Sequence, residues 1–309
     1  MTCPDAHKTH PGLPFGENGM PDQFASRFFQ TSDGPRIEFR DYPATARETG
    51  VPVLCLHGLT RNNRDFEELA PMIASCGRRV LAPSQRGRGA SDADPAPERY
   101  HPGTYAGDVL ALLTSLDISR AVFIGTSMGG LMTMICAALA PARVAAAVLN
   151  DVGPEVDPKG LARIRGYVGR AEAPTDWAHA TAICREINGS AFPGETSDAF
   201  WLKVARRIFW QPAPDRLVLN YDPAISQVVN TGAAVPPDLW PLFDALTPIP
   251  TLLVRGELSD ILMLSTVEEM RRRKPDLVFA GIPNIGHAPF LTEPAAWAAV
   301  RSFLHGLTT

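Results

Sequence analysis

Short apolar segments alternate along the chain with longer segments of helical periodicity, from about Ser32 to the C-terminus. Several of the short segments are apolar throughout and lack the polar–apolar alternation of a strand that faces water on one side. Such strands are typical of a parallel sheet that is buried on both faces. The predicted strands are 36–42, 51–56, 79–82, 121–125, 144–150, 251–255 and 277–280, and the predicted helices are 65–75, 104–116, 128–139, 266–273 and 294–304. This order predicts an α/β fold with a mostly parallel central sheet and helices on both faces.

The interval 154–246 breaks the alternation, because it contains no clear buried strand and is rich in Pro, Arg and aromatic residues. Four of the five tryptophans lie in it, at positions 177, 201, 210 and 240. An insertion at this point of an open sheet lies over the carboxyl ends of the strands, where such folds bind ligands. We therefore predict a helical lid at 154–246 between two parts of an α/β core, 25–153 and 247–309. Residues 1–24, rich in Pro, Gly and polar residues, are predicted to form a tail or a surface arm.

Composition and charge exclude several classes of function. The chain has 29 Lys and Arg against 33 Asp and Glu, a net charge of −4, and no extended basic patch that would predict nucleic-acid binding. It shows neither an apolar run of about 18 residues nor the apolar core of a secretion signal, which predicts a cytoplasmic protein without a membrane partner. The five cysteines do not suggest a disulfide framework. Because no metal-binding or nucleotide-binding motif is found, neither a metal nor a cofactor is expected.

The sequence Gly-Thr-Ser-Met-Gly-Gly at 125–130 fits the GxSxG pattern and lies between a predicted strand and a predicted helix. A strand that turns at once into a helix strains the central residue and leaves no room for larger flanking side chains. The hydroxyl of Ser127 would project from this turn, and the amide of Met128 would lie at the helix N-terminus, where negative charge is favoured. Ser127 is therefore the candidate nucleophile.

A nucleophilic serine requires a base and an acid that orients the base. His287 lies in a predicted loop after the last strand, and its imidazole can accept a proton near neutral pH. Asp260 follows the predicted strand 251–255, and its carboxylate would fix the tautomer of His287. Because Ser127, Asp260 and His287 each follow a predicted strand, we expect them to form a catalytic triad.

From about Ser32 onward the chain resembles the α/β hydrolase superfamily, which has this Ser–Asp–His order. The sequence His57-Gly58 after an apolar strand is similar to the HG motif of that family. The resemblance implies that the amide of Leu59 joins that of Met128 in an oxyanion hole, and that His57 has a packing and hydrogen-bonding role. It also implies a helical lid over the core. A serine at position 127 argues against the haloalkane dehalogenase and epoxide hydrolase branches, which have aspartate there.

Two features leave the resemblance incomplete. The segment 83–92 is similar to the family motif PDxRGxGxS, but Ser84 stands where Asp is usual, which raises a question about hydrogen bonding beside the site. Some members of the family take the triad acid from the strand that follows the nucleophile, and here Asp151 ends that strand. We predict Asp260 as the acid, with Asp151 as the first alternative and Glu257 as the second.

These residues predict a serine hydrolase, most simply a carboxylesterase that cleaves a small, partly apolar ester or lactone. The aromatic residues of the lid predict an apolar pocket, with Trp201, Phe209, Trp210 and Tyr221 as substrate-binding residues, although packing within the lid is the alternative. An acyltransferase or a carbon–carbon bond hydrolase would use the same triad. The alternative outside enzymes is a ligand receptor or signalling protein of the same fold, and a homo-oligomer is left open.

Overall fold

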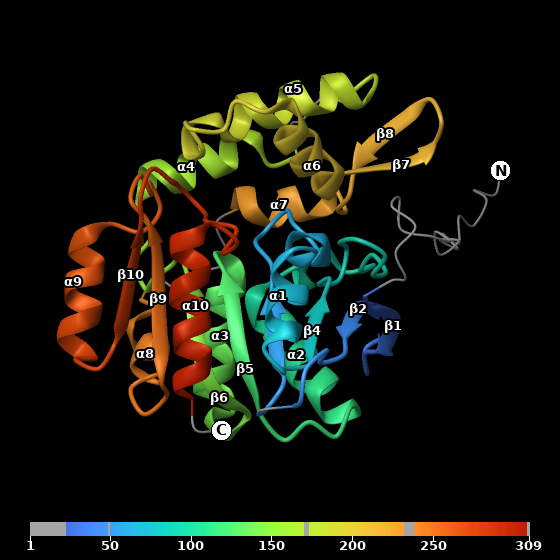
Figure 1. Cartoon of the computed structure of the whole chain (residues 1–309). Coiled ribbons are helices and arrows are strands. Elements are labelled where there is room, and N and C mark those ends of the chain that lie inside the picture. The colour runs from blue at the N-terminus through green and yellow to red at the C-terminus, as the bar shows by residue number, and fades with distance from the viewer. Residues whose placement is uncertain (1–22, 49, 170–172, 232–237, 308–309) are drawn as a thin grey trace.

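The central sheet has eight strands in the order β1-β2-β4-β3-β5-β6-β9-β10 (Figure 1). The computed structural model describes residues 23–48, 50–169, 173–231 and 238–307, so the predicted tail at 1–24 lies almost wholly outside the described residues. The strand β2 is antiparallel to both of its neighbours, and the other pairs are parallel. The strands are β1 (Ala25–Gln30), β2 (Arg36–Tyr42), β3 (Val53–Leu56), β4 (Val80–Pro83), β5 (Ala121–Thr126), β6 (Val144–Asn150), β9 (Thr251–Gly256) and β10 (Val278–Ile282). The predicted α/β fold with a mostly parallel sheet is confirmed.

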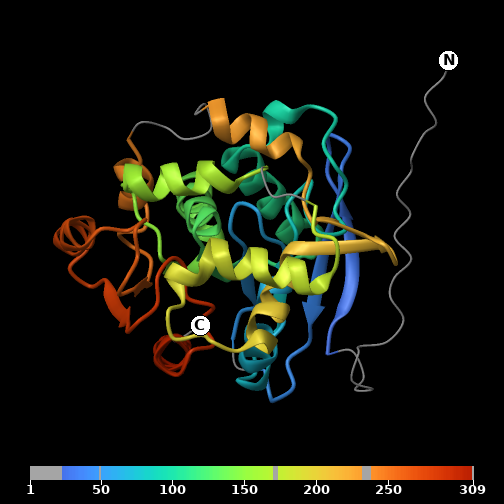
Figure 2. The ribbon, with the colours of Figure 1, turned by 90° about the horizontal axis from the view of Figure 1, so that it is seen from above.

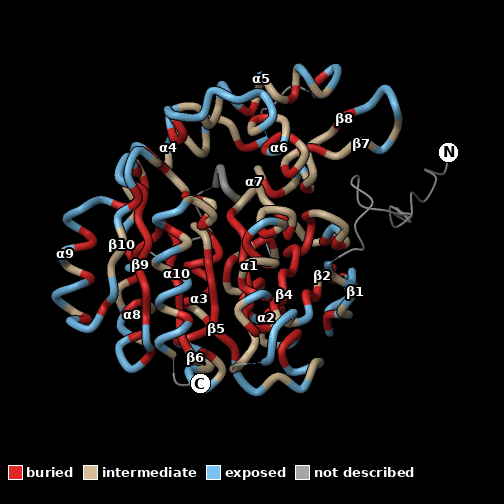
Figure 3. Tube along the Cα trace, viewed as in Figure 1, coloured by how far each residue is buried: buried red, intermediate tan, exposed pale blue. Residues whose placement is uncertain are grey.

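Helices cover both faces of the sheet, and each face has its own apolar core. The helices around the sheet are α1 (Leu69–Ser75), α2 (Pro102–Ser115), α3 (Met128–Leu139), α8 (Trp240–Asp244), α9 (Leu264–Arg273) and α10 (Pro294–Gly306), with short 3-10 turns η1 (Asn63–Phe66), η2 (Pro97–Arg99) and η3 (Pro141–Arg143). In β5, Phe123 belongs to the core under α2 and α3, while Val122 and Ile124 belong to the core under α1 and α10. Successive residues of a strand point to opposite faces, so a strand buried on both faces is apolar throughout. Figure 3 shows these central strands as buried.

The interval 154–246 lies mostly above the carboxyl ends of the strands (Figures 1 and 2). Its elements there, which we call the lid, are α4 (Pro158–Tyr167), α5 (Trp177–Asn188), η4 (Gly189–Ala191), α6 (Asp198–Ile208), β7 (Phe209–Ala213), β8 (Arg216–Leu219) and α7 (Ala224–Thr231). The strands β7 and β8 form an antiparallel hairpin, which differs from the wholly helical insertion that the sequence predicted. The helix α8 falls inside the predicted interval, but it packs on α3 and belongs to the core.

Backbone hydrogen bonds attach the lid to the core close to the loops that carry the candidate site. The amide of Gly89 donates to the carbonyl of Asn220 at 3.1 Å, and the amide of Gly286 donates to the carbonyl of Ala191 at 2.6 Å. No described helix is long and apolar enough to cross a membrane.

Candidate active site

Ser127 occupies the turn between β5 and α3 in a strained conformation, with φ 53° and ψ −117°. An ideal Cβ on Gly125 would lie 2.3 Å from the carbonyl oxygen of Gly129, and one on Gly129 would lie 2.1 Å from that of Leu56. Only glycine fits at either position, since real Cβ atoms essentially never come within 3.0 Å of such neighbours. These two glycines let the strand turn directly into the helix, so the side chain of Ser127 stands at the tip of the turn.

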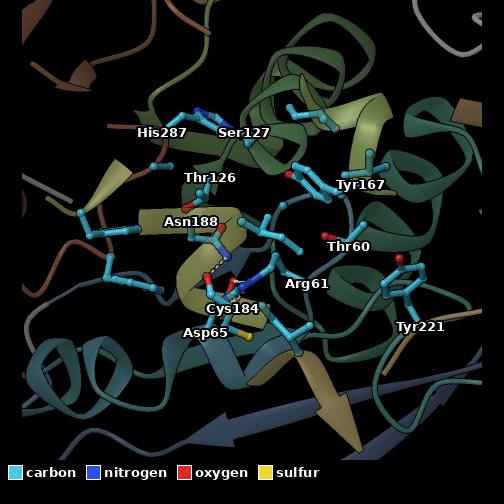
Figure 4. Close-up of a pocket in the computed structure, with 18 of the residues that line it drawn as sticks. Thr60, Arg61, Asp65, Thr126, Ser127, Tyr167, Cys184, Asn188, Tyr221 and His287 are labelled. Carbon is cyan, nitrogen blue, oxygen red and sulfur yellow. Dashed lines mark hydrogen bonds and ion pairs between the residues drawn. The ribbon is translucent and has the colours of Figure 1, made fainter. Parts of the chain in front are cut away.

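His287 connects Ser127 to a buried carboxylate. Its Nε2 lies 2.9 Å from Oγ of Ser127, and its Nδ1 lies 2.8 Å from Oδ2 of Asp151. The two distances allow hydrogen bonds at both ring nitrogens. Figure 4 shows Ser127 and His287 side by side at one end of the cavity. The predicted nucleophile and base are thus brought together, from segments 160 residues apart in the chain.

Asp151, rather than Asp260, is the acid that contacts His287. Its side chain is fully buried, and its carboxylate also accepts hydrogen bonds from the amide of Gly256 at 2.9 Å and from Oγ of Ser259 at 2.7 Å. These two donors hold the carboxylate in place toward Nδ1 of His287. Sequence reasoning missed Ser259, because its role depends on the proximity of the ends of β6 and β9.

The expectation that Asp260 completes the triad is wrong in this structure. Asp260 forms a bidentate ion pair with Arg163 of α4, with N–O distances of 2.6 and 2.8 Å. The hydrogen bonds from Arg163 lower the pKa of Asp260 below its ordinary value. Glu257, the remaining alternative, instead accepts a hydrogen bond from the amide of Asn284 at 3.2 Å. Asp260 therefore joins the lid to the core.

The two candidate oxyanion residues, Leu59 and Met128, are linked by the buried side chain of Arg88. Its Nε donates to the carbonyl of Leu59 at 2.9 Å, and its Nη2 lies 4.0 Å from the sulfur of Met128. Its Nη1 donates to Tyr105 at 2.9 Å, which fixes the guanidinium from the other side. Leu59 lines the same cavity as Ser127. Arg88 thus fixes the loop whose amide was assigned to the oxyanion hole.

Ser84, which replaces the usual Asp of the motif at 83–92, is satisfied by its neighbours. Its Oγ accepts from the amide of Asn63 at 3.1 Å, and its carbonyl accepts from Oγ of Ser91 at 2.7 Å. An ideal Cβ on Gly89, where φ is +59°, would lie 2.6 Å from Oγ of Ser84. The small serine therefore fits a crowded turn, and its own hydroxyl and carbonyl both have hydrogen-bond partners.

His57 has the structural role expected for it. Its ring is fully buried, with Nδ1 2.7 Å from the carbonyl of Gly58 and Nε2 accepting from the amide of Gln85 at 2.9 Å. The acceptor role of Nε2 fixes a neutral tautomer in which Nδ1 carries the proton. Burial lowers the pKa of His57 to about 3.

His57→Gln is expected to reduce the loss of stability in acid. Unfolded histidine binds a proton near pH 6.5, whereas folded His57 resists protonation, so stability falls as the pH drops through this window toward 3. Within it, this one group costs about 1.4 kcal/mol of unfolding free energy for each pH unit. Urea unfolding at about pH 5.5 and about pH 4.5 should therefore show a shallower pH dependence in the variant by that amount. His305→Gln, at an exposed position, is the control, and equal slopes for wild type and His57→Gln would contradict the prediction.

The cavity beside Ser127 has mainly apolar walls and extends between the core and the lid. Phe209 and Tyr221 line it, as predicted from the aromatic residues. Trp201 does not, because it is fully buried in the core of the lid, where its Nε1 donates to the carbonyl of Glu195 at 2.9 Å. Trp210 pairs with Val218 in the hairpin and is also absent from the cavity wall. The assignment of both tryptophans to substrate binding is therefore corrected, since Trp201 packs in the core of the lid and neither tryptophan lines the cavity.

Comparisons with known proteins give the family. Residues 51–294 match the model of the alpha/beta hydrolase fold. The chain belongs to the α/β hydrolase family. Within the described residues, no cluster of three or more His, Cys, Asp or Glu side chains could hold a metal ion.

Several relatives of this α/β hydrolase are named as hydrolases. It is 33% identical to a 3-hydroxybutyrate-oligomer hydrolase of Cupriavidus necator, over 82% of this chain and 88% of the relative. It is 28% identical to a 2-(acetamidomethylene)succinate hydrolase of Mesorhizobium japonicum, over 86% of this chain and 90% of the relative. A crystal structure of an alpha/beta hydrolase from Novosphingobium aromaticivorans shares 46% identity with a TM-score of 0.85, covering 92% of this chain and 98% of that chain.

Proposed function

We propose that the protein is a serine hydrolase that cleaves carboxylic esters through an acyl-enzyme intermediate. The observation that carries the proposal is the continuous contact from Asp151 through His287 to Ser127, at 2.8 and 2.9 Å. A serine hydroxyl is a poor nucleophile unless a base removes its proton, and this arrangement supplies the base and its orienting acid.

The reaction would proceed in two halves. In the first, Oγ of Ser127 attacks the ester carbonyl while Nε2 of His287 takes the hydroxyl proton. The amides of Leu59 and Met128 stabilise the tetrahedral oxyanion. The C–O bond of the ester then breaks, the alcohol leaves with the proton from His287, and the acyl group stays on Ser127. In the second half, His287 deprotonates a water that attacks the acyl-enzyme, and the acid product leaves with Ser127 restored.

The choice of an ester bond is supported by the cavity and by the relatives. The cavity that contains Ser127 is also lined by aliphatic and aromatic side chains such as Ile164, Phe192 and Leu219, which suit a partly apolar substrate. The relative from Cupriavidus necator is named for the hydrolysis of 3-hydroxybutyrate oligomers, and hydroxy acids of this kind are joined by ester bonds. Both named substrates of the relatives, an oligomer of a hydroxy acid and a succinate, also carry carboxylate groups.

A fluorophosphonate probe would test the proposal directly. The activated serine should displace fluoride and form a covalent phosphonate ester, so mass spectrometry should find one adduct per chain on the peptide that contains Ser127. The same enzyme should release a burst of p-nitrophenol from p-nitrophenyl acetate that equals the enzyme concentration, because acylation precedes slower deacylation. Heat-unfolded protein is the control and should take up no probe. An adduct on a different serine, or none on the folded protein, would overturn the proposal.

A further inference from the structure

Arg61 places a guanidinium in the wall of the cavity that contains Ser127. It lies two residues after Leu59, in the loop that leads into η1. Its Nε lies 3.0 and 2.9 Å from the two carboxylate oxygens of Asp65, and its Nη2 lies 2.6 Å from Oδ1. Figure 4 shows the pair across the cavity from His287, which lies beside Ser127. Neither residue belongs to the catalytic arrangement described above.

The pair leaves one arm of the guanidinium available. Nε and Nη2 face Asp65, while no residue in the described part of the chain accepts a hydrogen bond from Nη1. Burial works to lower the pKa of Arg61, but the attraction of Asp65 outweighs it and raises the pKa above its ordinary value. Arg61 is thus a fixed, charged donor whose remaining N–H groups are not used within the described protein.

The pair lies in a part of the cavity that also has apolar walls. The side chains of Arg61 and Asp65 are only 17% and 13% exposed, and Phe66, Ile183 and Ile187 line the same cavity. A guanidinium among apolar groups loses hydration that its partners must replace. Asp65 supplies part of that replacement, and the free Nη1 is suited to an acceptor on the substrate.

The side chains of Arg61 and Ser127 both start near Gly58, although the guanidinium of Arg61 ends farther along the cavity. An ideal Cβ on Gly58 would lie 3.5 Å from Cγ of Arg61 and 3.8 Å from Cβ of Ser127. Gly58 therefore lies close to both side chains, and all three residues line the cavity.

We propose that Arg61 binds a carboxylate at the end of the substrate remote from the scissile ester, and that Asp65 holds the guanidinium in position for it. This inference rests on the proposed function and narrows the substrate to esters of dicarboxylic acids or of hydroxy acids with a free carboxylate. Asp65 neutralises the charge of Arg61, so there is little long-range attraction for a substrate carboxylate. The carboxylate is instead bound by short charge-assisted hydrogen bonds at Nη1. An uncharged amide at the same place would bind more weakly.

Two matched substrates test the proposal: mono-p-nitrophenyl adipate, with a free carboxylate, and its terminal amide. Wild type should have the higher kcat/KM for the acid. In Arg61→Met/Asp65→Leu, which replaces the whole ion pair by apolar groups and avoids an unpaired buried charge, the acid-to-amide ratio should fall roughly tenfold or more. Arg163→Met is the matched control, because Arg163 pairs with Asp260 outside the cavity wall, and it should keep the wild-type ratio. A double variant with the wild-type ratio, or a wild type without preference, would overturn the assignment of Arg61.

Calorimetric binding of adipate separates this inference from the proposed function, since it needs no turnover. Adipate should bind the wild type roughly tenfold more tightly than it binds Arg61→Met/Asp65→Leu. If no ester is cleaved but this difference is found, the proposed hydrolysis fails and the carboxylate site stands. Equal binding to the two proteins would overturn the carboxylate site, whatever the esterase activity. Thermal unfolding of the double variant, measured alongside, confirms that the compared protein is folded.

Discussion

Asp151→Asn is expected to lower kcat for ester hydrolysis by roughly 10⁴-fold, whereas Asp260→Asn should change it by no more than a few fold. The carboxylate of Asp151 can only accept a hydrogen bond at Nδ1 of His287, so Nδ1 carries the proton and Nε2 is free to take the proton of Ser127. An amide at position 151 can donate to Nδ1 instead, which moves the ring proton to Nε2. A protonated Nε2 cannot act as the base, and the imidazolium of the transition state loses its counter-charge.

The measurement is kcat for a p-nitrophenyl ester with wild type and the two variants, with urea unfolding on the same samples. Unfolding must be included, because Asp151 also accepts hydrogen bonds from Gly256 and Ser259, and its substitution disturbs both. Asp260→Asn is the matched control: it makes the same chemical change one strand further along the sheet and weakens only the ion pair with Arg163. A large loss of kcat in Asp260→Asn with little loss in Asp151→Asn would show that the acid comes from β9 and that the contact seen here is not the catalytic one.

The sequence located Ser127 and His287 because each is marked by a local pattern. The glycines around Ser127 follow from the steric limits of one turn, and His287 lies in the loop between the last strand and the last helix. The acid is different, because Asp151 and Asp260 both follow strands and both satisfy the chain order. What separates them is the distance of each carboxylate from Nδ1 of His287, which depends on packing between segments more than 100 residues apart. A sequence pattern of short range does not contain that distance.

The lid was predicted in position but not in detail for a related reason. Its strands are short and β7 contains Gln211 and Pro212, so the hairpin of β7 and β8 resembled a loop between helices. The aromatic residues there were visible in the sequence, but their direction was not. Trp201 points into the core of the lid, whereas Phe209 and Tyr221 face the cavity. The edge strand β1 was missed because most of its residues are exposed and give little apolar pattern.

The motif at 83–92 forms the turn beside the site. Its Arg86 lies at the centre of a buried cluster of charged side chains. The guanidinium, 1% exposed, donates to both oxygens of Asp108 at 2.8 and 2.6 Å, and its Nη1 also contacts Asp94 and Asp33. The side chain of Asp94 is fully buried. The hydrogen bond from Arg86 also holds the pKa of Asp33 down to about 2. Arg86 thus pairs with three carboxylates, two of which have little access to water.

Arg86→Met is therefore expected to lower the free energy of unfolding by about 3–5 kcal/mol at neutral pH, because it leaves Asp108 buried without its cation and leaves Asp94 with Arg99 alone. Arg99→Met is the matched control: Arg99 also pairs with Asp94, but it is 32% exposed, so its loss should cost about 1 kcal/mol or less. Urea unfolding of the three proteins checks both values, and the penalty of Arg86→Met should shrink as the pH approaches 4, where the unpaired carboxyl of Asp108 takes up a proton. Equal destabilisation by the two substitutions would contradict the role of burial in this cluster.

The charged cluster is also linked to the active site. The carbonyl of Arg86 accepts a hydrogen bond from Nη1 of Arg88, and Arg88 holds the carbonyl of Leu59. The expected loss of stability in Arg86→Met should therefore be accompanied by a lower kcat.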